Sequence, residues 1–503
     1  GVSTIDLSTG KNHLHYILSK QEDSGHWIDE IGRYIHFYNP SEILFHFEGF
    51  KMNKDQIIQN WDIQHNSIQI NHYDEKEYLK TTYQNDFLNK IFNLNIMISP
   101  IEHFDLEMKP ELVISYVFML QYIHDHLLNT LTNIEIPEYV SDNNSLCLTS
   151  NSIRQLNVIN NYSYFKGKNE SLLSICNLCV TTMGRRLFKE RLLYPSIDIN
   201  TINKRYDYID LFRENDLFDI VHSQLRKVSD LEKSLRKMGL NLLQRGDFFS
   251  DTLSFEYVNK FLDIIVKEET LKGKYDTSIY EPFLEFYTEC EDTFIFHNLT
   301  QFGNLERKIL KEGVNIDMDN YDKMTEEYYN DMIMISNRFS HLLDSSDNSI
   351  KVDFDERNDW FFYCTNKRAI TFKERLTNLN SNSFHVKDEN GKIRYSFKST
   401  DFTFKKKDGS STMIQFNVCK ELSNKLLSIQ DKIKKLNKCE WESRISKLYD
   451  KYSSGLKKFY SFLAEIDSYC AAAKLSIKNG YNRPEIVNSE KSFVECTGIR
   501  HPI

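Results

Sequence analysis

The chain of 503 residues contains little proline and little glycine, with 8 and 17 residues respectively. Because both residues interrupt regular helices, their scarcity favours long helices and few tight turns. The sequence also lacks any run of 18 or more apolar residues, so we expect no membrane-spanning helix. It contains no G-x-x-x-x-G-K-[ST] phosphate loop and no apolar run ending in Asp-Glu, so it has no recognisable site for the phosphates of ATP.

The nine cysteines are scattered along the chain and are odd in number, so they predict no disulfide framework. This usage fits an intracellular, reducing compartment, in which thiols serve as small apolar residues. Cys176 and Cys179 form a single C-x-x-C pair with no second pair nearby. We place this pair on one helix with Cys179 on the buried face, and a packing role is favoured over metal binding.

The longest helical signal covers residues 421–479, which contain no proline and one glycine, Gly455. The apolar residues recur at steps of three and four, with one skip of five between Leu436 and Trp441. Such a seam is typical of a helix packed lengthwise against another helix. Residues 321–342 show the same spacing, so we predict an antiparallel pair of long helices, with a local bend at the skip.

Between these two stripes, residues 346–420 switch to the alternating pattern of strands, which predicts a β-rich insert. The charge also changes sign there. The whole chain has a net charge of -9, whereas residues 360–420 hold 12 Lys and Arg against 5 Asp and Glu. Residues 1–140 are acidic, with 9 basic against 20 acidic residues. A basic module in an acidic chain favours a polyanionic partner such as a nucleic acid backbone.

The basic residues of the insert are the candidate contacts, because phosphate groups are bound by long cationic side chains. Alternation in strands would place Lys392 and Arg394 on one strand face, and the Asp408-Gly409 turn would place the residues before it at the mouth of a hairpin. The predicted DNA-binding residues are Lys367, Arg368, Lys373, Arg375, Lys392, Arg394, Lys398, Lys405, Lys406 and Lys407.

The N-terminal segment predicts a small α/β domain. Residues 1–10 read as a strand and the start of a hairpin, residues 27–38 as a helix and residues 42–47 as a strand. From residue 152 to 343 the pattern is helical. One stripe there runs from Leu172 through Cys179 to Leu187, so we predict a single helix that Pro195 closes, with Asp198 as the N-cap of the next helix.

Residues 167–212 resemble the core signature of MutS-type DNA mismatch-repair proteins. In that family a Ser-Leu-Leu turn leads into a helix ending in T-x-M-G-R-R-L, followed by L-x-x-P-x-x-D and I-x-x-R. The matching residues here are Ser171-Leu172-Leu173, Thr181 to Leu187, Leu192-Leu193, Pro195, Asp198, Ile202 and Arg205.

Other segments resemble the same family and occur in the family's order. Residues 1–10 (GVSTIDLSTG) are similar to the opening strand of its connector domain, and residues 229–233 (SDLEK) to a segment of its helical core. Residues 309–319 resemble the start of its first long arm and residues 463–467 (LAEID) the end of the returning arm. Residues 481–502 resemble the Y-x-R-P and G-R-H-P motifs that precede its ATPase domain. The resemblance therefore covers nearly the whole chain.

The resemblance implies a mainly α fold with α/β and β-rich modules. The expected divisions are an RNase H-like connector over residues 1–140, a helical core with a descending lever over 150–345, and a DNA clamp over 346–420. An ascending lever and core return would follow over 421–487, and the start of an ATPase domain over 488–503.

The resemblance also implies a function. In the family a mismatch-sensing domain would precede Gly1 and an ATPase domain would follow Ile503, so this chain would be the part that encircles duplex DNA and links the two. It would contain no catalytic, cofactor or metal site, while the full-length protein would bind ATP and magnesium. The expected partners are duplex DNA, a second MutS-like subunit in a homodimer or heterodimer, and a MutL-like protein at the connector. The protein would be found with the DNA, in a nucleoid, a nucleus or a viral factory.

Two alternatives remain open. The first is a non-enzymatic coiled-coil scaffold whose basic tip binds RNA or an acidic protein. The second is a metal-dependent nuclease that uses Asp6, because RNase H-like nucleases hold metal with an aspartate on the first strand. A two-metal site needs three or four converging carboxylates. Glu30, Glu42, Asp86 and Glu102 are available, but they show no motif spacing.

His124 and His126 are a further possible metal pair. Side chains two positions apart on a helix point to different faces, so the sequence disfavours a shared metal.

Overall fold

The structure is a computed structural model, mostly helical with several small sheets, as the sequence predicts. It describes residues 1–18, 25–47, 52–61, 63, 68–70, 78–94, 96–127, 130–140, 145–146, 148–159, 171–268, 271, 274–300, 305–343, 349–378, 383–387, 391–491, 493–500 and 502. The chain forms two compact units. The larger unit is Gly1–Phe286 with Ile445–Ile503, and the smaller unit is Tyr287–Arg444. No helix in the described residues is long and apolar enough to cross a membrane.

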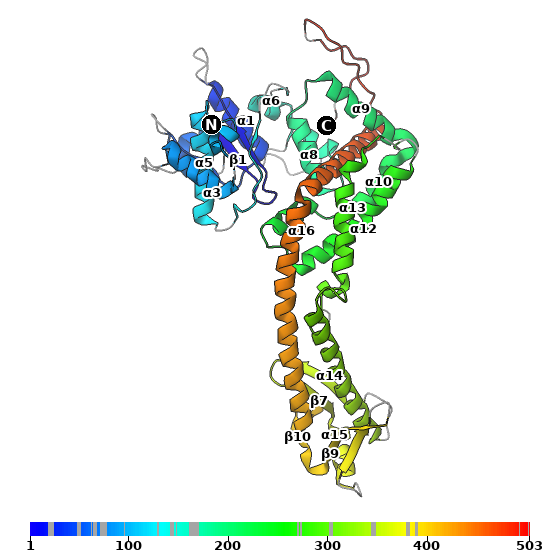
Figure 1. The fold of residues 1–503 in the computed structure, drawn as a ribbon. Helices are drawn as coiled ribbons and strands as arrows, with labels where there is room; N and C mark the ends of the chain where they lie inside the picture. The colour runs from blue at the N-terminus through cyan, green and yellow to red at the C-terminus, as the bar shows by residue number, and fades with distance from the viewer. Residues whose placement is uncertain are drawn as a thin grey trace. The chain divides into compact units, whose positions relative to one another are not determined.

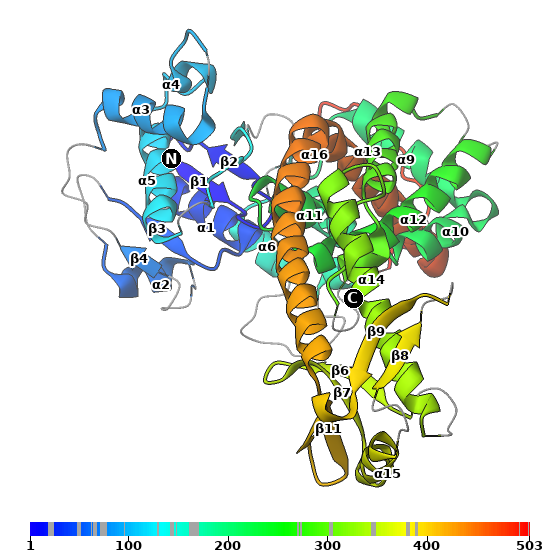
Figure 2. The ribbon, with the colours of Figure 1, turned by 60° about the horizontal axis from the view of Figure 1, so that its bottom comes forward.

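The larger unit begins with the predicted hairpin. Strands β1 (Val2–Ile5) and β2 (Asn12–His15) pair antiparallel, and β5 (Glu138–Tyr139) adds to β2 in parallel. Helix α5 (Pro110–His126) packs on this sheet, with α1 (His26–Tyr38) nearby (Figure 2). The predicted helix over 27–38 is therefore confirmed. The remaining elements of this region are β3 (Ile43–Phe45) and β4 (Ile68–Ile70), which pair in parallel, and α2 (Lys54–Trp61), α3 (Thr81–Phe92) and α4 (Pro100–His103).

The rest of the larger unit is helical. Asp198 caps helix α9 as predicted, because its carboxylate accepts hydrogen bonds from the backbone of Asn200 and Thr201. The elements are α6 (Ser150–Gln155), α7 (Leu172–Cys176), α8 (Thr182–Leu193), α9 (Ile199–Arg213), η3 (Glu214–Asp216), α10 (Leu217–Leu225), α11 (Leu231–Gly239), α12 (Arg245–Lys267) and η4 (Thr277–Ile279). Helix α13 (Glu281–Thr293) begins in this unit, and η5 (Phe296–Leu299) follows in the smaller one.

The single helix predicted across the 172–187 stripe is wrong. Helix α7 ends at Cys176 and α8 begins at Thr182, so Cys179 lies in the connection between them. The chain leaves the helical path because the free N–H groups at the start of α8 have other acceptors there, including the Thr181 hydroxyl. Cys179 is buried as expected, and burial raises the pKa of its thiol, which suits packing.

The connection between α7 and α8 is held by Asp467, a fully buried carboxylate of helix α16 (Asn417–Asn479). It accepts hydrogen bonds from Val180 N at 3.0 Å, Thr181 N at 2.8 Å and Thr181 Oγ1 at 2.6 Å. His222 Nε2 lies 3.0 Å from Asp467 Oδ1, the oxygen that also accepts from Val180 N. A Cβ at position 184 would clash with this carboxylate, so Gly184 is required sterically. Thr181, Gly184 and Asp467, which lie in the motifs that carry the family resemblance, thus meet in one contact.

We expect Asp467→Ala to destabilise the larger unit by about 3–5 kcal/mol, because it leaves several buried donors without an acceptor. The exposed Asp450 on the same helix provides the matched control, and Asp450→Ala should change stability by less than about 0.5 kcal/mol. Urea unfolding followed by circular dichroism measures both. Equal midpoints for the two variants would show that the Asp467 contact contributes little.

In the smaller unit, α14 (Ile316–His341) lies antiparallel to the first part of α16. The long helix predicted over residues 421–479 is confirmed as α16, which has 63 residues, and Figure 1 shows it as one continuous element. Contacts between the two helices run in opposite directions along the chain. They join Asn315 to Glu440, Thr325 to Gln430, and Tyr328 to Lys425.

The skip of five residues between Leu436 and Trp441 does not interrupt α16. It contains a buried polar residue, Asn437. Asn437 is fully buried and lies four residues after Ile433 and four before Trp441, so the seam passes through it rather than through half-buried Leu436. Its Nδ2 donates to Glu306 Oε1 at 2.8 Å and to the Arg307 carbonyl at 2.9 Å. Its Oδ1 accepts from Ile309 N at 3.2 Å. The predicted seam, which ran through Leu436, is wrong at this point because the polar side chain of Asn437 occupies the core position.

The described residues 349–378, 383–387 and 391–416 form the insert between α14 and α16, which we call the β module. Strands β10, β11, β7 and β6 form an antiparallel sheet in that order, and β8 and β9 form a separate hairpin. The elements are β6 (Lys351–Asp355), β7 (Asp359–Thr365), α15 (Asn366–Thr377), β8 (Ser383–Lys387), β9 (Ile393–Lys398), η6 (Ser399–Asp401), β10 (Thr403–Lys406) and β11 (Ser411–Gln415).

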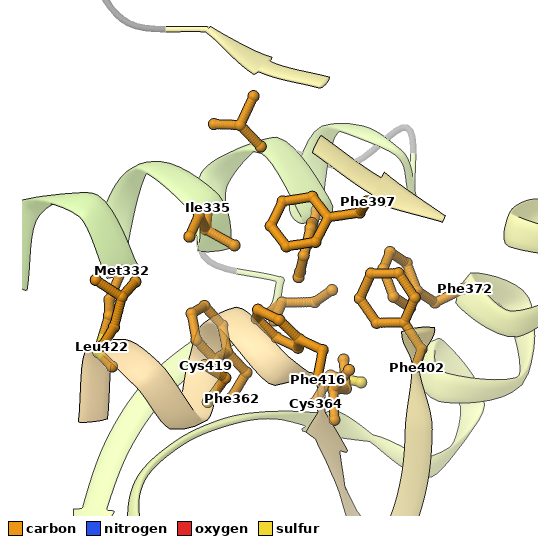
Figure 3. Close-up of a cluster of buried hydrophobic side chains, with 14 of the residues drawn as sticks. Met332, Ile335, Phe362, Cys364, Phe372, Phe397, Phe402, Phe416, Cys419 and Leu422 are labelled. Atoms are coloured by element: carbon orange, nitrogen blue, oxygen red, sulfur yellow. The ribbon is translucent and has the colours of Figure 1, made fainter. Parts of the chain in front are cut away.

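Aromatic side chains fill the core of the β module. Phe372, Phe397, Phe402 and Phe416 gather there with Phe362 (Figure 3). The ring of Phe339 from α14 contacts each of these five rings. Helix α15 was not predicted, although its buried residues Ala369, Phe372 and Leu376 have helical spacing. This core fixes the backbone on which the predicted DNA-binding residues stand.

Candidate nucleic-acid interface

The predicted hairpin around Asp408 is confirmed. Lys407 N donates to the Ser411 carbonyl, and the Asp408 carboxylate accepts from the backbone of Ser410 and Ser411 at 2.7 Å each. These bonds close the turn between β10 and β11. Lys405 and Lys406 lie on β10 directly before it.

Lys405 and Lys406 are exposed, and neither forms an ion pair with any residue in the described part of the chain. They are adjacent on a strand, so they point to opposite faces of the sheet. Their register partners are Met413 and Thr412 on β11. Both ammonium groups are therefore available to an anionic partner.

Lys407 is in a different environment. Its Nζ lies 3.1 Å from Asp353 Oδ2 and stands 4.6 and 4.0 Å from the ring centroids of Phe361 and Tyr363. Only 24% of its side chain is exposed. Lys407 is therefore less available to an anionic partner than Lys405 and Lys406, because a carboxylate and two aromatic rings already surround its charge.

Helix α15 carries four of the predicted residues, and they divide into two kinds. Lys367 and Lys373 are exposed. Arg368 donates to the Ser349 carbonyl at 3.4 Å, and Arg375 donates to the Leu342 carbonyl at 2.6 Å. Because Leu342 follows the last turn of α14, Arg375 satisfies a carbonyl at that helix end.

The predicted residues near β9 also divide. Arg394 pairs with Asp331 of α14 at 2.9 Å, and the Tyr395 hydroxyl donates to the same carboxylate at 2.6 Å. Burial, together with this bond, raises the pKa of Tyr395 to about 12. Lys392 and Lys398 are exposed. Lys392 directly precedes the first residue of β9, and that it shares a strand face with Arg394 stays a prediction.

The structure therefore separates the predicted residues by environment. Six lysines are exposed, whereas two arginines bind carbonyls and two further cations pair with carboxylates. Sequence alone could not make this division, because the partners Asp331 and Asp353 lie outside the basic segment. Whether the exposed residues bind DNA stays a prediction.

The structure gives no support to a nuclease site at Asp6. Its carboxylate accepts from Ser8 N at 2.9 Å and Ser8 Oγ at 2.7 Å. Burial alone would raise its pKa, but the bonds from Ser8 and Thr9 and the charge of Arg186 lower it overall. Within the described ranges, no three His, Cys, Asp or Glu side chains lie close enough to hold a metal. This covers Glu30, Glu42, Asp86, Glu102 and both histidines of the 124–126 pair.

Comparison with known proteins shows the family of this chain. The model of the family described as MutS domain III matches residues 151–473. That match covers more than half of the 503 residues, so the chain belongs to the MutS family.

Proteins named for DNA mismatch repair are similar over the whole chain or most of it. A putative DNA mismatch repair protein, a mutS homolog of Acanthamoeba polyphaga mimivirus, is 25% identical over 546 aligned residues, with 100% of this chain and 48% of the relative covered. DNA mismatch repair protein MutS of Borrelia hermsii is 24% identical, with 100% and 52% covered. The same protein of Fervidobacterium nodosum is 26% identical, with 80% and 44% covered. The chain thus spans about half the length of the curated relatives that it matches.

The different environments of Lys406 and Lys407 lead to a prediction about stability. We expect Lys407→Ala to lower the free energy of unfolding of the smaller unit by about 1–2 kcal/mol, because it removes a partly buried ion pair and two ring contacts. Lys406→Ala, its matched neighbour, should change it by less than about 0.5 kcal/mol. Thermal unfolding followed by tryptophan fluorescence compares the two variants, and Trp360 is the tryptophan of the β module among the four in the chain. A larger loss for Lys406→Ala would contradict this assignment of the two lysines.

Proposed function

We propose that this chain is the DNA-holding part of a MutS mismatch-repair protein, and that its β module contacts the phosphate backbone of duplex DNA. The observation that carries the proposal is the hairpin of β10 and β11, which presents Lys405 and Lys406 without carboxylate partners among the described residues. The hairpin is part of the sheet that covers the phenylalanine core, so its position is defined before any partner binds.

The charge of the module supports this proposal. Residues 360–420 contain 12 basic against 5 acidic residues. Arg394 and Lys407 are paired with carboxylates outside this segment, yet the remaining cations still exceed the acidic residues. Lysine contacts to phosphate carry no base information, so binding by these residues would be independent of sequence and of mismatches.

The role of the complete protein is part of the proposal. Relatives of about twice this length are named for DNA mismatch repair, which supports a role in that process. From the family resemblance we propose that the chain links mismatch sensing to an ATPase domain. We further propose a second MutS-like subunit, so that two clamps encircle the duplex, and a MutL-like partner at residues 1–140. ATP and magnesium would act in the complete protein.

The proposal predicts a salt dependence. The double change Lys405→Ala/Lys406→Ala should weaken duplex binding and lower the slope of log affinity against log salt by about 1.8, at ~0.9 per lost phosphate contact. Folding should be unaffected because both side chains are exposed. Fluorescence anisotropy with a labelled duplex over a salt series measures the slope.

The matched control removes two exposed lysines of α16, in the variant Lys434→Ala/Lys435→Ala. This variant changes the net charge of the chain by the same amount as the Lys405/Lys406 change. A similar decrease in its salt slope would therefore show an effect of net charge and not of the hairpin. A duplex affinity that ignores both salt and the Lys405/Lys406 change would end the proposal. A parallel titration with single-stranded RNA tests the scaffold alternative, which requires RNA to lose more affinity than the duplex.

The catalytic expectation can be tested on the same protein. We expect no ATP hydrolysis by this chain, because its sequence contains no phosphate loop. Magnesium-dependent cleavage of DNA should also be absent, because Asp6 has no metal-binding companions in the part that the structure describes. Cleavage that Asp6→Asn abolishes would establish the nuclease alternative instead.

A further inference from the structure

A groove of about 350 Å³ lies between one face of α14 and strand β8. The residues that line it on α14 recur at steps of one and three, so they share a single helix face. None of the groove's residues belongs to the set predicted from the sequence as DNA contacts. Those that the following argument uses are Ile333, Met334, Arg338, Val386 and Lys387.

Apolar side chains form part of the groove's lining. Ile333 and Met334 are half-buried, and the buried Val386 borders the groove from β8. Phosphate groups gain nothing from such a surface, whereas the burial of an apolar side chain of a bound peptide is favourable. A methionine side chain is flexible and polarizable, so it adapts to different apolar partners. This lining therefore fits a peptide better than a nucleic acid backbone.

The formal charge of the lining is positive. Arg338 and Lys387 are exposed and form no ion pair with any residue that the structure describes. Among the described residues, no Asp or Glu lines the groove. The buried carboxylate of Asp331 on α14 is already paired with Arg394. A partner that combines apolar side chains with carboxylates would therefore complement the groove in charge as well as in polarity.

The groove lies at the edge of a small sheet. Within the described part of the chain, β8 pairs with β9 alone, and no residue of β9 lines the groove. Extended peptides bind at sheet edges by adding a strand, and the surface beside the edge selects their side chains. The lining runs from residue 330 to residue 341 of α14, about 16 Å along the helix axis, which matches about five residues of an extended peptide at ~3.3 Å each.

We propose that this groove binds an acidic, partly apolar peptide segment of a partner protein. The peptide runs in extended form beside β8, with its apolar side chains on the apolar lining and its carboxylates on Arg338 and Lys387. This site is separate from the hairpin that carries Lys405 and Lys406, and it does not require that the hairpin binds DNA.

A synthetic peptide tests the site. The probe is a fluorescein-labelled peptide of about eight residues, long enough to span the groove, in which Leu alternates with Glu. The reference is the same peptide with Lys in place of Glu. We expect the acidic probe to bind at low salt and the basic peptide not to bind, because the cations of the groove repel it. Fluorescence anisotropy with the whole chain measures both.

Charge reversal in the groove should weaken binding of the acidic probe. Arg338→Glu/Lys387→Glu should lower its affinity about tenfold or more, because two attractive charges become repulsive. The matched control Lys434→Glu/Lys435→Glu reverses two exposed lysines of α16 and changes the net charge equally, so affinity should stay within about twofold. Circular dichroism melting checks that both variants fold.

A second variant tests the apolar part of the site. Met334→Gln keeps the approximate length of the side chain and removes apolar surface, so it should weaken the probe several-fold. Because no charge changes, the dependence of probe affinity on salt should stay as it is in the unchanged protein.

The outcomes decide between a peptide and a nucleic acid as the occupant. If the acidic probe fails to bind, or if the control variant weakens it as much as the groove variants do, the groove is not a peptide site. If the probe fails to bind while Arg338→Glu/Lys387→Glu weakens duplex binding, the groove serves nucleic acid and the inference is wrong. Duplex binding through the hairpin is measured separately, so the proposed function can stand when this inference fails.

Discussion

The buried carboxylate of Asp467 is the contact on which the larger unit most depends. A buried charged group is stable only when it has hydrogen-bond partners in place of water. For Asp467 these partners are the backbone of the α7–α8 connection and His222. The same bonds hold Thr181, the N-cap of α8, whose hydroxyl accepts from Gly184 N in the first turn of that helix, so the Asp467 carboxylate helps to fix where α8 begins. Gly184 follows from this contact, because the space that its missing Cβ leaves is occupied by the carboxylate. Helix α16 is thereby fixed to α8 and α10.

Buried polar groups have a comparable role in the smaller unit. Asn437 and Gln430 of α16 bond to the extended backbone that precedes α14, at Glu306, Arg307 and Ile309. An apolar interface between two helices tolerates a shift of one helical turn more easily than a polar one. After such a shift, a buried amide would lose its hydrogen-bond partners. The register of α14 against α16 therefore depends on a few amides.

The β module shows how one residue type serves two purposes. Lys407 and Arg394 are held by Asp353 and Asp331, so their charges act mainly within the protein. Lys405 and Lys406 differ from Lys407 by one or two positions but face solvent. Burial and the nearest carboxylate, rather than the presence of a basic residue, decide which cations remain available to DNA.

Much of the fold could be predicted from the sequence because its signals are local. The apolar spacing of residues 421–479 specified a long helix, the alternation near residue 1 and the Asp408-Gly409 turn specified hairpins, and Asp198 marked a helix start. The motifs from residue 171 onward specified the family. In each case the determining interactions lie within a few residues of one another.

The tertiary structure decided what depends on distant partners. The break before α8 exists because Asp467 comes from nearly 290 residues away, and the polar position at Asn437 is stable because the 306–309 backbone lies against it. The same holds for the site, where Asp353 occupies Lys407 from 54 residues away and leaves Lys406 free. A sequence pattern contains the residue types but not these pairings, and the pairings set which charges are neutralised and which remain exposed to solvent.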